Sequence, residues 1–210
     1  MMTVLFEDEN LIVCVKPAGV LSEKGAGLSM PSLIEEHTGG EPFTVHRLDR
    51  ETRGITVYAK TRDCAAALSE SIRNGGVEKE YLAVVCGTLN EKSGSMTDYL
   101  LHDERKNLTK VVPENTKGAK KAELEYEIIA ESGGFSLARI VLITGRTHQI
   151  RAQFSSRGCP LYGDRKYGGC RGDLALYACS LAFTHPVTGE KLRFEISPDY
   201  GISPWNFFNK

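Results

Sequence analysis

Short apolar runs rich in β-branched residues, most of them closed by glycine or proline, constrain the fold of this chain more than any other feature of its sequence. The first run, Leu11–Lys16, ends at Pro17 and has the length and composition of a buried strand. Further strands are predicted at 54–60, 77–86, 123–130, 135–143, 174–183 and 191–196. The fourth and fifth runs predict an antiparallel hairpin with a loop longer than two residues. The polar stretch 91–121 predicts a hairpin or a long surface excursion.

Three helices are predicted, and they interrupt the strands rather than alternating strictly with them. They cover 30–37, with Ser29 as N-cap and Gly39 at the end, 62–73, and 147–156, with Thr147 as N-cap. Strands that follow one another in this way favour an α+β fold with a central mixed, mostly antiparallel sheet. A chain of 210 residues can bury the core of a single domain.

The sequence argues against a metal site, a secreted protein and a membrane protein. The six cysteines have no zinc-knuckle spacing, and they are expected to be reduced and mostly buried. The five histidines also lack metal-ligand spacing, so neither a metal nor an organic cofactor is expected. The first residues show no basic segment followed by an apolar run, so a signal peptide is not expected, and no apolar run reaches about 18 residues. A cytoplasmic protein is therefore expected.

The charges are distributed unevenly along the chain. The net charge is −1, which argues against a nonspecific nucleic-acid binder. Between residues 46 and 62, however, five basic residues stand against two acidic ones, and between residues 139 and 173 seven stand against two. These two basic segments are suited to the phosphates of an RNA backbone.

The first chemical motif is Val45–Lys60, VHRLDRETRGITVYAK, in which Asp49 precedes a predicted strand. Three arginines flank this residue. A carboxylate in such a place can serve as a nucleophile, a base or an ion-pair acceptor. On these residues alone, an aspartate among arginines is more often structural than catalytic.

The second motif is Ile143–Gly168, ITGRTHQIRAQFSSRGCPLYGDRKYG. On the predicted helix, His148 and Arg151 are three residues apart and share a face. Gly145 and the helix N-terminus offer backbone donors to an anion. A phosphate-binding helix start and a solvated basic face fit these residues equally well.

The third motif is the strand EKEYLAVVCG at Glu78–Gly87, which contains Tyr81. A tyrosine in a strand is more often a core or edge aromatic than a catalyst. The residues alone therefore leave its role open.

In combination, the three motifs resemble the signature of the RluA-type pseudouridine synthases. The run HRLD with Thr52 and Gly54, the pattern Lys-x-Tyr-x-Ala-x-Val-x-Gly and the run GRTHQIR with the later GDRKYG occur in the family order. The opening VCVKPAGV is similar to the family's N-terminal strand and its lysine–proline turn. Arg53 departs from the pattern, because the family usually has serine at this position.

The resemblance implies a pseudouridine synthase fold. One catalytic domain is expected over residues 1–210, without the S4 RNA-binding domain that is common in relatives, because these residues leave no room for it. The resemblance also implies a monomeric isomerase that converts uridines of tRNA, large-subunit rRNA or both into pseudouridine without a cofactor. Asp49 would be the catalytic carboxylate, Arg151 its ionic partner, and Tyr81 an aromatic of the active site. The predicted RNA contacts are His46, Arg47, Arg50, Arg53, Arg146, His148, Gln149 and Arg165. Arg47 is also the candidate to fill the gap left by a flipped base.

Two other functions are consistent with parts of this pattern. A non-catalytic RNA-binding or ribosome-assembly factor could keep the fold, but loss of the aspartate or arginine would be its mark, and Asp49, Tyr81 and Arg151 are all present. A nucleoside or glycoside hydrolase using Asp49 would normally need a second carboxylate. Glu51 is near in sequence but has no distinctive acid role.

Overall fold

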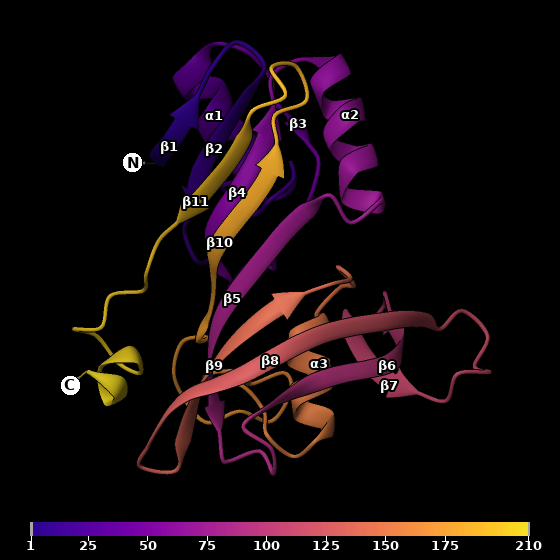
Figure 1. Ribbon diagram of the computed structural model, residues 1–210, viewed down its shortest axis with the longest axis vertical. Coiled ribbons are helices and arrows are strands. Elements are labelled where there is room, and N and C mark those ends of the chain that lie inside the picture. Colours follow the sequence, from indigo (N-terminus) through magenta and orange to yellow (C-terminus); the bar gives the residue numbers. More distant parts are fainter. Residues whose placement is uncertain (1, 210) are drawn as a thin grey trace. The chain divides into compact units, whose positions relative to one another are not determined.

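The structure is a computed structural model that describes residues 2–209 (Figure 1). It divides into two compact units. The first unit comprises residues 1–79 and 178–197, and the second unit comprises residues 80–177 and 198–210. Two strands, β5 (Val77–Cys86) and β10 (Leu176–Thr184), run from one unit into the other.

Four strand pairs of the first unit, β1–β2, β2–β4, β3–β4 and β10–β11, are antiparallel. The strand order of this unit is β1-β2-β4-β10, with β3 paired to β4 and β11 paired to β10. The bounds are β1 Thr3–Glu7, β2 Leu11–Lys16, β3 Phe43–Thr44, β4 Arg53–Ala59 and β11 Lys191–Glu195, with helices α1 Met30–Thr38 and α2 Arg62–Arg73. Gly54 has a φ of 134°, and a Cβ there would lie 2.2 Å from the carbonyl oxygen of Ala178. Glycine therefore lets β4 pass close to β10.

Helices α1 and α2 pack on opposite faces of β2, since successive residues of a strand point to opposite sides. Ile12 lies in one buried cluster with Ile34 of α1, whereas Val13 lies in another with Leu68 of α2. The two helices can be followed beside the β1–β2–β4 strands in Figure 1. Both faces of the continuous apolar run 11–16 are therefore used for packing.

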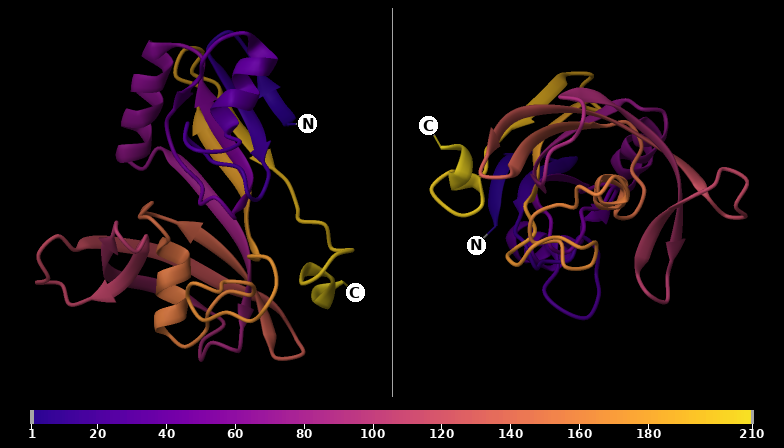
Figure 2. Two further views of the ribbon diagram at one scale, coloured as in Figure 1. Left: turned by 180° about the vertical axis from the view of Figure 1, so that it is seen from behind. Right: turned by 90° about the horizontal axis from the view of Figure 1, so that it is seen from below.

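The second unit has the strand order β5-β9-β8-β6-β7. The bounds are β6 Ser93–Asp103, β7 Leu108–Val112, β8 Lys120–Ser132 and β9 Phe135–Leu142, with helix α3 Gln149–Ser156 and a 3-10 turn at Trp205–Phe208. The neighbours in this order pair antiparallel. Ala152 of α3 packs with Leu100 of β6 and Ala122 of β8. Figure 2 shows α3 against these strands.

The expected α+β fold is confirmed, and so is the hairpin within 91–121, which is β6–β7. The predictions of the β8–β9 loop length and of the cysteine burial were wrong. The β8–β9 loop contains only Gly133 and Gly134, both with positive φ, because Ser132 already pairs with Phe135. The cysteines are less buried than expected, since Cys86 and Cys179 are half-buried and Cys170 is exposed.

Candidate active site

The loop that carries Asp49 is attached to the segment after β2 through the buried amine of Lys16. Its Nζ donates hydrogen bonds to the carbonyl oxygens of Pro17 (2.9 Å), Val20 (2.8 Å) and Arg50 (2.9 Å). Burial lowers the pKa of Lys16 to about 8, and this is partly opposed by the carboxylates of Glu51 and Asp49. Lys16 therefore fixes the main chain directly after Asp49.

Ser22 fixes the main chain on the other side of Asp49. Its hydroxyl donates to the carbonyl oxygen of Leu48 (2.8 Å) and accepts from the Leu48 amide (3.0 Å). The Ser22 carbonyl in turn accepts a hydrogen bond from the hydroxyl of Tyr58 (2.9 Å). Asp49 itself is half-buried, and its carbonyl oxygen accepts from the Thr52 amide at 3.0 Å. The residues before and after Asp49 are thus both held by side chains from segment 16–22.

His46 joins the start of the same loop to β4. Its Nε2 lies 3.1 Å from the Val57 amide, which donates to it, and 3.4 Å from the Thr56 hydroxyl. Shielding of the ring from water, and more weakly the Lys79 cation, lower the pKa of His46 to about 3. His46 can therefore meet RNA only as a neutral ring near neutral pH.

The three arginines around Asp49 are exposed. Arg47 pairs with Glu23 at 2.7 Å, and Arg50 donates from Nε to the Gly19 carbonyl at 3.0 Å. Arg53 is the first residue of β4. An exposed ion pair contributes little to stability, so Arg47 can exchange Glu23 for a phosphate or a base at small cost.

In the second unit, Arg151 lies on α3 and is buried against the carboxylate of Asp164. The guanidinium donates from Nε to Oδ2 (2.7 Å) and from Nη2 to Oδ1 (2.8 Å). The guanidinium carbon, Cζ, lies 5.0 Å from the centre of the Tyr167 ring, which is within cation–π range. Two parallel hydrogen bonds and a ring therefore fix the direction of this side chain.

Tyr167 links Arg151 to the residues before α3. Its hydroxyl lies 3.0 Å from Nδ1 of His148 and accepts a hydrogen bond from the Thr109 amide at 2.8 Å. His148 is the N-cap of α3 and has a left-handed backbone with φ of 53°, so the prediction of Thr147 as N-cap was wrong. Although His148 is not helical, it and Arg151 both contact Tyr167, as their shared face had suggested.

The remaining predicted site residues of the second unit have different environments. Tyr81 is buried in β5, opposite Ile140 of β9. Arg146 is exposed and donates from Nε to the Lys121 carbonyl at 2.9 Å. Gln149 is buried, and its side-chain oxygen accepts from the Arg146 amide at 3.0 Å. The hydrogen bond from the Arg146 amide to Gln149 stabilises the turn before α3. An RNA contact by Gln149 stays a prediction.

Arg165 lines an open hollow together with Gly169 and Arg171. The two cations make this hollow suitable for an anion such as a phosphate. Among residues 2–209, no group of three or more His, Cys, Asp or Glu side chains could hold a metal ion. None of the helices in this same range is long and apolar enough to cross a membrane.

The sequence interpretation missed three residues that position the predicted catalytic ones: Lys16, Ser22 and Asp164. Lys16 and Asp164 do lie within the lysine–proline turn and the GDRKYG run, so the motifs contained them without revealing their partners. Ser22 had no signal, because a serine in a polar loop is common. The predicted pairing of Arg151 with Asp49 joins residues of different units and stays a prediction.

Comparison with known proteins identifies the family. The model of the RNA pseudouridylate synthase family matches residues 10–156. The large-subunit pseudouridine synthase C of Escherichia coli K12 is 34% identical over 216 residues, which cover 95% of this chain and 67% of that protein. The corresponding protein of Pasteurella multocida is 36% identical, over 93% of this chain and 64% of its own length.

Solved structures agree on the fold. Human RNA Pseudouridylate Synthase Domain Containing 4 matches with a TM-score of 0.78 and 24% identity, covering 94% of this chain and 89% of its own. Human RNA Pseudouridylate Synthase Domain Containing 1 matches with a TM-score of 0.80 and 21% identity, covering 98% and 86%. The chain therefore belongs to the RNA pseudouridylate synthase family. The RluA-type resemblance is confirmed, and the chain is an isomerase that acts on RNA.

Proposed function

We propose that this enzyme isomerises uridines of large-subunit ribosomal RNA, with Asp49 as the catalytic carboxylate and Arg151 and Tyr81 in the same active site. One observation carries the proposal: the family match spans residues 10–156 and therefore includes all three residues. The RNA is that named for the bacterial relatives. Both units would then act as one catalytic domain over residues 1–210.

The reaction breaks the bond between ribose C1′ and uracil N1, turns the base and rejoins it through C5. It involves neither redox change nor hydrolysis, so a carboxylate that can attack or take a proton and later leave is sufficient. Asp49 would act on C1′, on the uracil ring or on the C2′ proton. The same aspartate serves all three routes.

The remaining residues would bind and orient the substrate. The bidentate contact with Asp164 fixes the guanidinium of Arg151, which would hold Asp49 ionised and aimed. Tyr81 would stack on uracil and assist a late proton transfer. The Arg47 side chain would occupy the space that the flipped-out base leaves among the stacked bases of the RNA. The predicted contacts to the RNA backbone are Arg50, Arg53, Arg146, His148, Gln149 and Arg165, with neutral His46 beside them.

We also propose that the enzyme acts as a monomer in the cytoplasm, where a ribosomal substrate would be found, and that it needs neither a metal nor a cofactor. These proposals rest on the relatives' substrate and on the chemistry of the isomerisation.

The test is release of tritium from transcripts labelled at uridine C5. Large-subunit rRNA fragments should release tritium without free uracil, and the Asp49→Asn variant on the same fragments is the matched control. Release from tRNA transcripts alone would replace the proposed substrate with tRNA. Free uracil would indicate a hydrolase, and binding without release from any transcript would indicate a non-catalytic RNA-binding protein.

A further inference from the structure

Two cysteines of the second unit bring their sulfur atoms together. The Sγ atoms of Cys86 and Cys170 lie 3.1 Å apart, although 84 residues separate them in the sequence. A disulfide bond needs a separation of about 2.05 Å. The two thiols are therefore within about 1 Å of bonding distance, a contact that cysteine spacing in the sequence could not reveal.

The loop that carries Cys170 is attached to β5 at its base. The Val84 amide donates to the Ala175 carbonyl at 3.1 Å, and the Val84 carbonyl accepts from the Tyr162 amide at 2.8 Å. The Tyr162 carbonyl also accepts from the Ala175 amide at 3.0 Å. Both ends of loop 162–175 therefore lie beside the strand whose last residue is Cys86.

Close packing also fixes the course of the chain inside this loop. The Gly169 amide donates to the Asp164 carbonyl at 2.8 Å. A Cβ at Gly169 would lie 2.1 Å from the Leu161 carbonyl oxygen, and one at Gly163 would lie 2.0 Å from that of Asp173. Only glycine fits at these two positions, so the path that leads into Cys170 is constrained by the fold.

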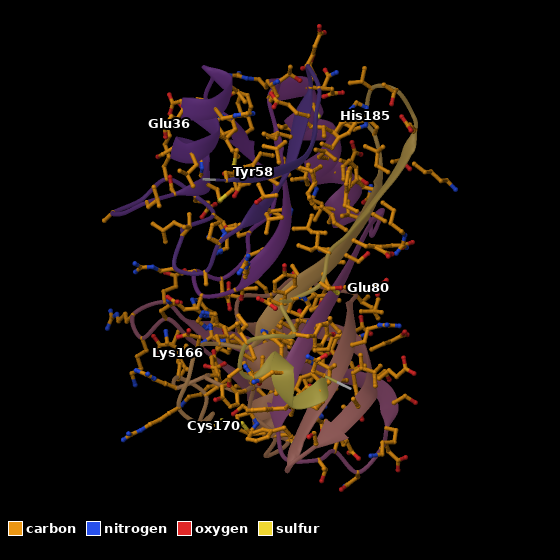
Figure 3. All side chains as sticks on the ribbon, turned by 90° about the vertical axis from the view of Figure 1, so that its left-hand side faces the viewer. Glu36, Tyr58, Glu80, Lys166, Cys170 and His185 are labelled. Carbon is orange, nitrogen blue, oxygen red and sulfur yellow. The ribbon has the colours of Figure 1, made fainter. Side chains whose placement is uncertain are left out.

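The two thiols differ in their access to solvent. Cys170 is exposed, and Figure 3 labels it with Lys166 on the same loop. Cys86 is half-buried, and burial raises the pKa of its thiol to about 11. The outer thiol can therefore meet a dissolved oxidant first, whereas the inner thiol is placed to react with whatever forms on the outer one.

We propose that Cys86 and Cys170 form a site of reversible thiol oxidation whose reacting partners are hydroperoxides. The Cys170 sulfur attacks the outer peroxide oxygen, the O–O bond breaks, and the alcohol or water leaves. The Cys86 sulfur then attacks the sulfenic acid on Cys170 and releases water. Two thiols lose two electrons and two protons in total, and one hydroperoxide is reduced to an alcohol and water. A dithiol reductant reduces the disulfide back to two thiols by thiol–disulfide exchange.

Oxidation has a structural consequence for the neighbouring basic hollow. Cys170 lies between Gly169 and Arg171, both of which line the hollow with Arg165. The disulfide ties this edge of the hollow to β5. The site itself does not depend on the proposed ribosomal substrate, because its detection requires no RNA.

The test treats the reduced, folded protein with hydrogen peroxide and follows its intact mass. The wild-type protein should lose the mass of two hydrogen atoms, regain it with dithiothreitol, and give a Cys86–Cys170 cross-linked peptide in an unreduced digest. In Cys86→Ser, the oxidation should stop at a Cys170 sulfenic acid that dimedone traps. The matched control, Cys179→Ser, removes another half-buried cysteine and should still form the cross-link.

Circular dichroism of each variant shows whether it has kept its fold before oxidation. Because the wild-type digest gives its result without any substitution, a variant that fails to fold does not decide the test. The proposal is overturned if the oxidised wild type carries Cys170 as a sulfinic acid, pairs either cysteine with Cys159, or remains fully reduced while the urea-unfolded chain oxidises.

Discussion

The loop around Asp49 and the start of helix α3 around Arg151 are held in different ways. In the first unit, Lys16 and Ser22 bind main-chain groups on either side of Asp49. In the second unit, Asp164 binds the Arg151 side chain itself through two hydrogen bonds. The first arrangement fixes where the chain passes, and the second fixes where a guanidinium points. Substitution of Asp49 should therefore leave its loop intact, whereas Arg151 and Asp164 depend on each other.

The largest expected effect is on catalysis at Asp49. The Asp49→Asn variant keeps every main-chain bond to the loop but lacks an ionised carboxylate. We expect tritium release to fall by at least about a thousandfold. RNA affinity, measured by filter binding, and the urea midpoint should stay close to the wild type. A large loss of stability would show that the side chain, and not only the main chain, supports the loop.

The next effect is on stability, at Asp164. The Asp164→Asn variant replaces the carboxylate that accepts two hydrogen bonds from the buried Arg151 guanidinium with a neutral amide, so the free energy of unfolding in urea should fall by about 3–5 kcal/mol. Glu123→Gln is the control in the same unit, because Glu123 pairs at 2.8 Å with the exposed Lys121. Its loss of stability should be much smaller, since an exposed ion pair contributes little. Equal losses in the two variants would show that the buried pair of Arg151 and Asp164 contributes no more to stability than the control pair.

Local sequence was enough to predict the parts of the molecule that depend on local physics. The Ser29 side chain accepts a hydrogen bond from the first turn of α1, and Gly39 ends α1 with a left-handed backbone. Strand β2 follows its apolar run residue for residue. These features are set by neighbours within a few residues, so a single segment carries the information.

The parts that escaped prediction depend on contacts between distant segments. Thr147 has a side chain suited to an N-cap. The N-cap is instead His148, which has a left-handed backbone and whose ring contacts the Tyr167 hydroxyl. Asp164 follows Arg151 by 13 residues, and Ser22 precedes Leu48 by 26, so no helical or strand periodicity links them. The motif resemblance named candidate residues without showing which of them bind one another.

A third prediction concerns pH and His46 in the first unit. The folded pKa of about 3 lies below the ordinary value of about 6.5 that applies on unfolding. The unfolded chain therefore binds more protons between these values, and the stability that neutral His46 contributes above about pH 6.5 is lost as the pH falls towards 3. The loss should reach at most about 1.4 kcal/mol per pH unit.

Urea midpoints between pH 7 and pH 4.5 measure this slope. His46→Gln keeps an acceptor for the Val57 amide but cannot take up a proton, so its stability should fall less steeply than that of the wild type. Identical slopes for the two proteins would mean that His46 does not hold the loop as a neutral acceptor.

The smallest expected effect is at Ser22, and it tests whether main-chain attachment matters for catalysis. Ser22→Ala removes both hydrogen bonds to Leu48 and should lower the free energy of unfolding by about 1–2 kcal/mol. Because Asp49 follows Leu48 directly, kcat should also fall by about tenfold with little change in KM. Ser29→Ala removes the N-cap of α1 in the same unit and should lower stability by about 1 kcal/mol. If kcat falls equally in both variants, the loss comes from general destabilisation, and the bonds to Leu48 have no separate role in placing Asp49.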